Sequence, residues 1–208
     1  MWQEPYRTLD AAKHWRARQK RRFVPRTTQS NHDQPIAPNW LAQTPAPVKP
    51  NQVWVVDLTY IDTGEGWIYL AVILDACSRK VVGWAMGLSL ETALVTEALQ
   101  RARTRRGPTP GLLHHSDRGV QYASGAYRAL LATYQITPSM TRPANPYDNA
   151  IAESFMATLK TECFDQPPRT RAEARLKAFE YLETFYNPRR LHSALGYQSP
   201  VEFENQFN

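Results

Sequence analysis

Three carboxylates lie at positions where a chemical role accounts for an acidic residue better than a purely structural role does. Asp57 lies inside WVVDLTY (residues 54–60), an apolar run with the composition of a buried strand. An ionised carboxylate buried without a partner is strongly unfavourable, so an arginine, backbone donors or a metal must compensate it. The run itself contains no basic residue. We therefore expect Asp57 to have a partner from elsewhere in the chain.

Asp117 follows a second short apolar run, residues 112–115. The ends of parallel strands are where α/β sheets place their ligands. If the two strands are neighbours, Asp57 and Asp117 approach one another and repel. A hard divalent cation with oxygen ligands, such as Mg²⁺, relieves that repulsion. His114 and His115 precede this acid, and we expect them to act as hydrogen-bonding supports rather than as ligands.

A third acid, Glu153, lies in a predicted helix over residues 149–163. Asn149 lies one turn before it and Lys160 two turns after it, so the three side chains share one helix face. Glu153 could complete a metal site while Lys160 reaches a neighbouring phosphate. Each acid taken singly is more often a solvated charge or a salt-bridge partner, so the argument is a joint one that depends on the strand order.

The elements that must position these acids follow from hydrophobic patterning. Runs rich in Val, Ile, Trp and Tyr predict strands, and apolar residues at helical spacing predict helices. Two short turns join the first three strands into a meander, whereas helices lead to the next two strands. The order βββαβαβαα predicts an α/β domain, a mixed five-stranded sheet with helices on both faces. The predicted strands are 53–61, 67–74, 81–87, 112–115 and 136–140, and the predicted helices are 91–105, 124–134, 149–163 and 171–186.

The positive charge of the chain is concentrated near its N-terminus. The 208 residues carry a formal charge of +6, and residues 1–50, with nine Lys or Arg and three Asp or Glu, account for all of it. We interpret residues 1–24 as a basic helix or arm, 25–52 as a Pro-rich linker and 53–208 as the folded core domain with a C-terminal helical extension. A solvated helix face or a solubilising tail is the alternative. The candidate nucleic-acid contacts in the arm are Arg18, Lys20, Arg21 and Arg22.

Composition excludes several classes of protein. The apolar fraction of 42% excludes an intrinsically disordered chain. No apolar run reaches the roughly 20 residues that span a bilayer, and no secretory signal is recognisable. The two cysteines lack the spacing of a disulfide framework or a zinc site. We therefore expect a cytoplasmic protein without a membrane partner.

The acids and their surroundings resemble a known family, the Asp-Asp-Glu transposases and retroviral integrases. Thirty-five residues separate Asp117 from Glu153, a spacing typical of integrases and of several bacterial insertion-sequence transposases of the orfB type. The resemblance covers about residues 16–205. The motifs that carry it are WVVDLTY (54–60), LDACSR (74–79), HSDRGVQY (115–122), YDNAIAESF (147–155), YNPRRLHSALGY (186–197) and SP (199–200).

The resemblance implies a ribonuclease H-like fold and a DNA transposase that cleaves phosphodiester bonds and transfers strands. It implies that Asp57, Asp117 and Glu153 coordinate two Mg²⁺ (or Mn²⁺) ions. One ion would activate water or a 3′-hydroxyl, and the other would stabilise the leaving 3′-oxygen. It further implies Lys160 as a DNA contact. Three residues are expected as supports near the site: Asn149, Arg118 and Gln121.

The implied partners are DNA, both as element ends and as target, and further copies of the chain in a homo-oligomer on that DNA. Residues 1–15 do not resemble the helix-turn-helix that usually precedes this core, which suggests a truncated copy. Two alternatives therefore stay open. One is a catalytically silent DNA-binding remnant, and the other is a ribonuclease H-like nuclease that never joins strands.

Overall fold

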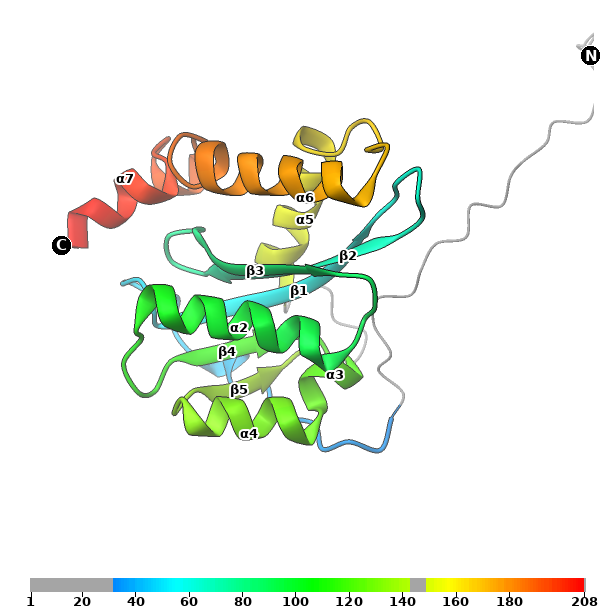
Figure 1. The fold of residues 1–208 in the computed structure, drawn as a ribbon. Coiled ribbons are helices and arrows are strands. Elements are labelled where there is room, and N and C mark those ends of the chain that lie inside the picture. The colour runs from blue at the N-terminus through cyan, green and yellow to red at the C-terminus, as the bar shows by residue number, and fades with distance from the viewer. Residues whose placement is uncertain (1–31, 143–148, 208) are drawn as a thin grey trace, which may run out of the picture.

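The computed structural model describes residues 32–142 and 149–207 (Figure 1). The predicted basic arm, with Arg18, Lys20, Arg21 and Arg22, lies outside the described residues, so the division at residue 24 stays a prediction. Among the described helices, none combines the length and the apolar character that crossing a membrane requires.

The sheet has five strands in the order β3-β2-β1-β4-β5. The first three pair in antiparallel fashion, whereas β4 pairs in parallel with β1 and β5 in parallel with β4. The mixed five-stranded sheet predicted from the sequence is therefore confirmed. The strands are β1 (Val53–Ile61), β2 (Ile68–Asp75), β3 (Val81–Gly87), β4 (Leu113–Ser116) and β5 (Thr137–Met140).

The pairing of β1 with β4 fixes the relation between two of the candidate acids. Val55 lies opposite His115 in this parallel pair. Asp57 and Asp117 each follow two residues after these partners. The two strands run in the same direction, so both acids lie toward the same edge of the sheet.

Helices cover both faces of the sheet, as predicted (Figure 1). On one face lie α2, α3 and α4, and on the other lie α5 and α6. The last predicted helix departs from a regular α-helix, since it continues after Phe179 as a π-helical segment, Glu180–Tyr186. The helices are α2 (Thr92–Arg106), α3 (Val120–Ala123), α4 (Gly125–Thr133), α5 (Ala150–Glu162), α6 (Arg171–Phe179) and α7 (Pro200–Glu204), with short 3₁₀ turns at Leu41–Gln43, Ser193–Leu195 and Asn205–Phe207.

Alternation along β1 divides the core into two clusters. Val53 and Val55 face α5, where they join a cluster that includes Leu159. Trp54 and Val56 face the opposite side and pack in the cluster that contains the buried face of α2. Successive side chains of a strand point to opposite faces. Asp57 therefore projects toward the α5 side of the sheet.

A buried ionic cluster fastens the C-terminal extension to the sheet. Glu204 of α7 accepts two hydrogen bonds from Arg106 at the end of α2, at 2.7 and 2.8 Å. It also accepts from Lys80 at 2.8 Å and from Ser78 at 2.7 Å, both in the turn between β2 and β3. These bonds lower the pKa of Glu204 against the opposing effect of its burial. Three segments far apart in the sequence are thereby held together.

The packing of α2 on β3 depends on a glycine, and this generates a stability prediction. A Cβ at Gly83 would lie 2.5 Å from the carbonyl oxygen of Ala98 and 2.6 Å from Cβ of Ala102. We expect Gly83→Ala to lower the free energy of unfolding by about 1–3 kcal/mol, because the helix must move away from the sheet. Urea denaturation followed by circular dichroism measures this loss.

Gly125→Ala is the matched control. Nothing lies within 4 Å of a Cβ at Gly125, the first residue of α4. Alanine also favours the helix over glycine, so this variant should be at least as stable as the parent. Equal stability of the two variants would contradict the proposed steric role of Gly83.

Candidate active site

Asp57 is a carboxylate in an environment that disfavours its charge. It lies on β1, partly buried, and its Oδ1 accepts a hydrogen bond from the backbone N–H of Leu58 at 2.7 Å. The pKa of Asp57 is raised to about 7, first by burial and then by the nearby charges of Asp117 and Glu153. The bond from Leu58 and the charge of Lys160 oppose this rise in pKa. The acids from β1, the end of β4 and α5 therefore act on one another.

Asp117 lies in the tight loop that follows β4. Its Oδ1 accepts a hydrogen bond from the backbone N–H of Gly119 at 2.8 Å. A Cβ added to Gly119 would lie 2.9 Å from that oxygen and 2.9 Å from Oε1 of Gln121. Glycine is thus required for the loop to bring its backbone close to these two oxygens.

Glu153 and Lys160 extend from α5, the helix that covers β1. Glu153 is exposed in the first turn of this helix. Lys160 places its Nζ 4.8 Å from the centroid of the Tyr60 ring, a cation–π contact between α5 and β1. Since both charges affect the pKa of Asp57, they lie on the side of α5 that faces the candidate site.

Buried oxygen atoms without hydrogen-bond partners surround the two aspartates. Asn149 donates through Nδ2 to the carbonyl of Val56 at 3.2 Å, which places its amide beside Asp57, but its Oδ1 is buried and accepts no hydrogen bond. Gln121 donates through Nε2 to Leu90 at 2.9 Å, and its Oε1 is likewise buried without a partner. Such atoms are destabilising unless something binds them.

The hydroxyl of Tyr122 is a third buried atom without a hydrogen-bond partner. Burial raises the pKa of Tyr122 well above its ordinary value, and the charges of Asp117 and Asp57 raise it further. The neutral hydroxyl therefore lies close enough to both carboxylates for their charges to affect its pKa. Sequence reasoning missed a role for this tyrosine, although it lies within the motif that contains Asp117.

The donor set suits a hard divalent cation. Carboxylate and amide oxygens are the ligands that Mg²⁺ prefers, and Asp57, Asp117, Gln121 and Asn149 supply such oxygens with little competing protein contact at the two amides. Within residues 32–142 and 149–207, however, no three side chains of His, Cys, Asp or Glu lie together as a metal-binding group. The acids interact through their charges without forming a closed ligand shell.

The remaining predicted residues have structural partners. Arg118 donates through Nε to the carbonyl of Thr141 at 2.7 Å, so it supports the loop that follows β5. His114 is buried against the hydroxyl of Tyr127 at 2.9 Å, and burial lowers its pKa to about 3, which keeps it neutral. His115 contacts the hydroxyl of Ser139 at 2.9 Å. Both histidines thus form the hydrogen bonds expected of supports.

Comparison with known proteins identifies the family. Two family models described as Integrase core domain match residues 47–146 and 134–200. The chain is 47% identical, over 93% of its length, to the insertion element IS600 uncharacterized 31 kDa protein of Shigella sonnei. It is 46% identical, over 80% of its length, to the transposase for insertion sequence element IS904 of Lactococcus lactis. It spans 71% and 66% of the lengths of these two relatives.

A solved structure supports the same fold. The integrase catalytic core domain of HTLV-2, in complex with magnesium and in a dimeric form, matches 76% of this chain and 98% of its own with a TM-score of 0.57 at 18% identity. The mixed sheet with helices on both faces is thus the ribonuclease H-like fold predicted from the resemblance. The chain therefore belongs to the insertion-sequence transposases with an integrase core domain, a family of polynucleotidyl transferases.

Proposed function

We propose that this chain cleaves phosphodiester bonds at the ends of an insertion sequence and joins the freed DNA strands to target DNA, with Asp57, Asp117 and Glu153 as its catalytic carboxylates. One observation carries the proposal. The parallel pairing of β1 with β4 brings Asp57 and Asp117 to one edge of the sheet, where burial, Asp117 and Glu153 raise the pKa of Asp57 to about 7. Acids gathered in this way are typical of catalytic sites.

The three carboxylates would hold two Mg²⁺ or Mn²⁺ ions. When bound, such ions activate the attacking oxygen and stabilise the leaving oxygen in an in-line displacement at phosphorus. The magnesium bound to the HTLV-2 integrase core supports this choice of cation. Asp57 must lose its proton before it binds a cation, and its raised pKa places that loss near neutral pH.

Residues around the acids would position the DNA. Lys160, which lies on the same face of α5 as Glu153, supplies a positive charge for a phosphate of the bound strand. Gln121 and Asn149 bind the backbone through their amide nitrogens and leave their buried amide oxygens without a protein partner, so they support the geometry of the site. Arg118, whose Nε is bonded to Thr141, acts as a structural support.

The substrate and assembly follow from the family. DNA, as element ends and as target, is the proposed substrate, and a homo-oligomer on DNA is the proposed working form, in line with the dimeric form of the HTLV-2 core. A cytoplasmic location remains a prediction. A nuclease without strand transfer would use the same carboxylates, so only the products distinguish it. A silent DNA-binding remnant would give no metal-dependent product at all.

The first test replaces the carboxylate that the other acids act on. Asp57→Asn removes a charged oxygen ligand, so we expect it to lower Mg²⁺-dependent cleavage and strand transfer at least about a hundredfold while leaving the circular dichroism spectrum unchanged. The assay uses DNA that carries the element ends, and gels resolve nicked from joined products. Asp165→Asn, at an exposed acid remote from the site, is the matched control and should retain full activity. Activity that survives Asp57→Asn would remove the proposal.

The raised pKa of Asp57 predicts a pH dependence of stability in the metal-free protein. Its pKa is about 7 in the folded chain and 3.8 as the model value for a free carboxyl. The folded state therefore binds the proton more tightly, so this group lowers the free energy of unfolding progressively as pH rises from about 4 to about 7. Asp57→Asn should remove this fall and stabilise the metal-free protein at pH 8 by about 1–3 kcal/mol.

Urea denaturation of both proteins across this pH range, without divalent metal, measures the difference. Added Mg²⁺ should stabilise the wild-type protein at pH 8 more than it stabilises Asp57→Asn, because a ligand that binds only the folded state raises its stability. Parallel pH profiles for the two proteins would contradict the assignment of the raised pKa to Asp57.

A third prediction concerns Lys160. Lys160→Gln removes one phosphate contact, so the affinity for DNA should fall about threefold to tenfold, and the dependence of log affinity on log salt should become shallower by about one. Fluorescence anisotropy with labelled duplex in EDTA measures both. Lys177→Gln, at a lysine of α6 paired with Glu173 at 3.5 Å, removes the same charge elsewhere and should bind DNA normally. Equal losses in the two variants would point to a general charge effect.

A further inference from the structure

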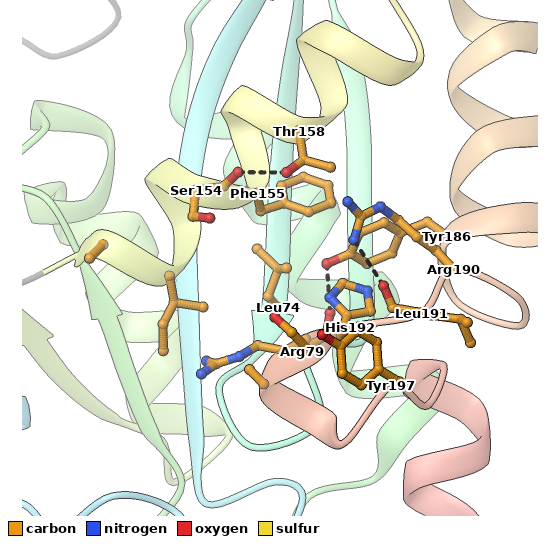
Figure 2. A pocket seen from close by; sticks show the side chains of 14 residues that line it. Leu74, Arg79, Ser154, Phe155, Thr158, Tyr186, Arg190, Leu191, His192 and Tyr197 are labelled. Carbon is orange, nitrogen blue, oxygen red and sulfur yellow. Dashed lines mark hydrogen bonds between the residues drawn. The ribbon is translucent and has the colours of Figure 1, made fainter.

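A cavity of about 600 Å³ opens on α5, lined by residues other than the three acids (Figure 2). Its walls come from the first two turns of α5, the end of β2 with the turn that follows it, and residues 186–197 of the C-terminal extension. The lining residues include two arginines, Arg79 and Arg190, and no Asp or Glu. The wall of the cavity therefore carries positive charge and no carboxylate.

Arg79 is a partly buried cation in the wall of this cavity. Its guanidinium donates through Nη1 to the carbonyl of Ala76 at 2.7 Å, and none of the ion pairs identified among the described residues includes it. Burial lowers the pKa of Arg79. The charge of Asp75 opposes this fall in pKa only in part, and an anion in the cavity would stabilise a partly buried arginine that is in no ion pair.

The backbone at Arg79 has an unusual conformation, and a contact from the C-terminal extension holds it in place. Its φ is +61°, in the left-handed region that non-glycine residues adopt at a cost of about 1 kcal/mol or more. The hydroxyl of Tyr186 donates to the carbonyl of Arg79 at 3.1 Å, and Tyr186 itself lines the cavity. The turn between β2 and β3 is thus fixed from the C-terminal extension, so that the Arg79 side chain lies in the cavity wall.

His192 lies between the two arginines. Its Nε2 is buried and has no hydrogen-bond partner. Burial, followed by the charges of Arg190 and Arg79, lowers the pKa of His192 to about 4. The ring is therefore neutral at pH 7, and both guanidinium charges reach it. Arg190 is already paired with Glu162, at 2.6 Å, which leaves Arg79 as the cation available to a ligand.

Helix α5 contributes polar groups to the same cavity. Ser154 and Thr158 line it, and Ala150 and Ile151 bring the first turn of the helix to its edge. The N-terminal end of a helix carries a partial positive charge that favours an anion. The Thr158 hydroxyl donates to the carbonyl of Ser154 at 3.0 Å. The Ser154 hydroxyl and this helix end are therefore the donors that α5 adds to the arginine for the oxygens of a phosphate group.

We propose that this cavity binds a phosphate group of the DNA backbone, as a second contact point for the strand that the carboxylates act on. The inference rests on the proposed function, since it assigns the anion to the same DNA. Glu153 is adjacent in sequence to Ser154, so one helix turn serves both sites. An α-helix is about 10 Å wide, and phosphates advance about 3.4 Å per nucleotide along a duplex. A single DNA molecule therefore reaches from one site to the other within a few nucleotides.

The closing experiment measures DNA binding by the full chain in EDTA, where no cleavage occurs. Arg79→Gln keeps a polar side chain, although a shorter one, and removes its charge. We expect its affinity for labelled duplex DNA to fall about fivefold to tenfold and its salt dependence to become shallower by about one. Arg101→Gln, at a surface arginine of α2 paired with Glu97 on the opposite face, is the matched control and should bind like the parent.

A second pair of variants tests the same cavity without changing the turn that contains Arg79. A folding defect in that turn therefore does not affect this result. Ala194 is exposed and lines the cavity. Ala194→Asp places a carboxylate at the mouth and should weaken DNA binding about as much as Arg79→Gln does, whereas Ala194→Asn has nearly the same size and should bind normally. Equal behaviour of the Asp and Asn variants, or normal binding by both Arg79→Gln and Ala194→Asp, would overturn the inference.

Inorganic phosphate is the second probe, because a free anion presents the same oxygens as a nucleotide. Titration of phosphate, followed by calorimetry, tests the parent and Arg79→Gln. Loss of phosphate binding in the variant with unchanged DNA affinity would overturn the assignment to DNA. The affinity for DNA is measured without metal, so the result of this binding experiment does not depend on the result of the Asp57→Asn cleavage assay. Reduced binding in Arg79→Gln, together with activity that survives Asp57→Asn, would retain the phosphate site and reject the proposed catalytic residues.

Discussion

The parallel pairing of β1 with β4 is the constraint on which the site depends. It brings a carboxylate from within one strand and a carboxylate from the end of another to the same edge of the sheet. Their mutual repulsion and the burial of Asp57 raise its pKa to about 7. A hydrophobic core on each face of the sheet holds the strands in this register. The fold thus stabilises an arrangement of charges that would separate if its parts were free to move.

Helix α5 belongs to both sites, because one of its sides contacts β1 and another lines the basic cavity. Lys160 contacts the Tyr60 ring on β1, while Ser154 and Thr158 line the basic cavity. The far end of the helix is fixed where Glu162 accepts hydrogen bonds from Arg190 and from the hydroxyl of Tyr181 at 2.7 Å. The C-terminal extension therefore does more than cover the core. It sets the position of the helix that carries Glu153.

The sheet could be predicted from the sequence because alternating apolar runs and short turns leave few ways to order five strands. The sequence brought Asp57 and Asp117 together only on the condition that their strands are neighbours, and the structure has that pairing. The position of Glu153 depends on how α5 packs, which no local pattern encodes, so the sequence predicted it only as a residue that could complete the site. The π-helical segment at Glu180–Tyr186 and the left-handed backbone of Arg79 also escaped prediction. The left-handed conformation of Arg79 is held both locally, by its N–H bond to the carbonyl of Asp75 at 2.9 Å, and from the C-terminal extension, by the bond from Tyr186.

Unsatisfied polar groups connect the two sites. Folded proteins pair nearly all their buried polar atoms, so exceptions that gather in one region indicate a ligand. At the sheet edge the exceptions are the hydroxyl of Tyr122 and two acceptors, the amide oxygens of Asn149 and Gln121. In the cavity the exception is Nε2 of His192, beside Arg79, a cation that is in none of the ion pairs of the described residues. Acceptors beside carboxylates favour a cation, and an arginine outside any ion pair favours an anion. A phosphodiester with its metal ions provides both. The two sites are therefore complementary in charge, and one substrate satisfies them together.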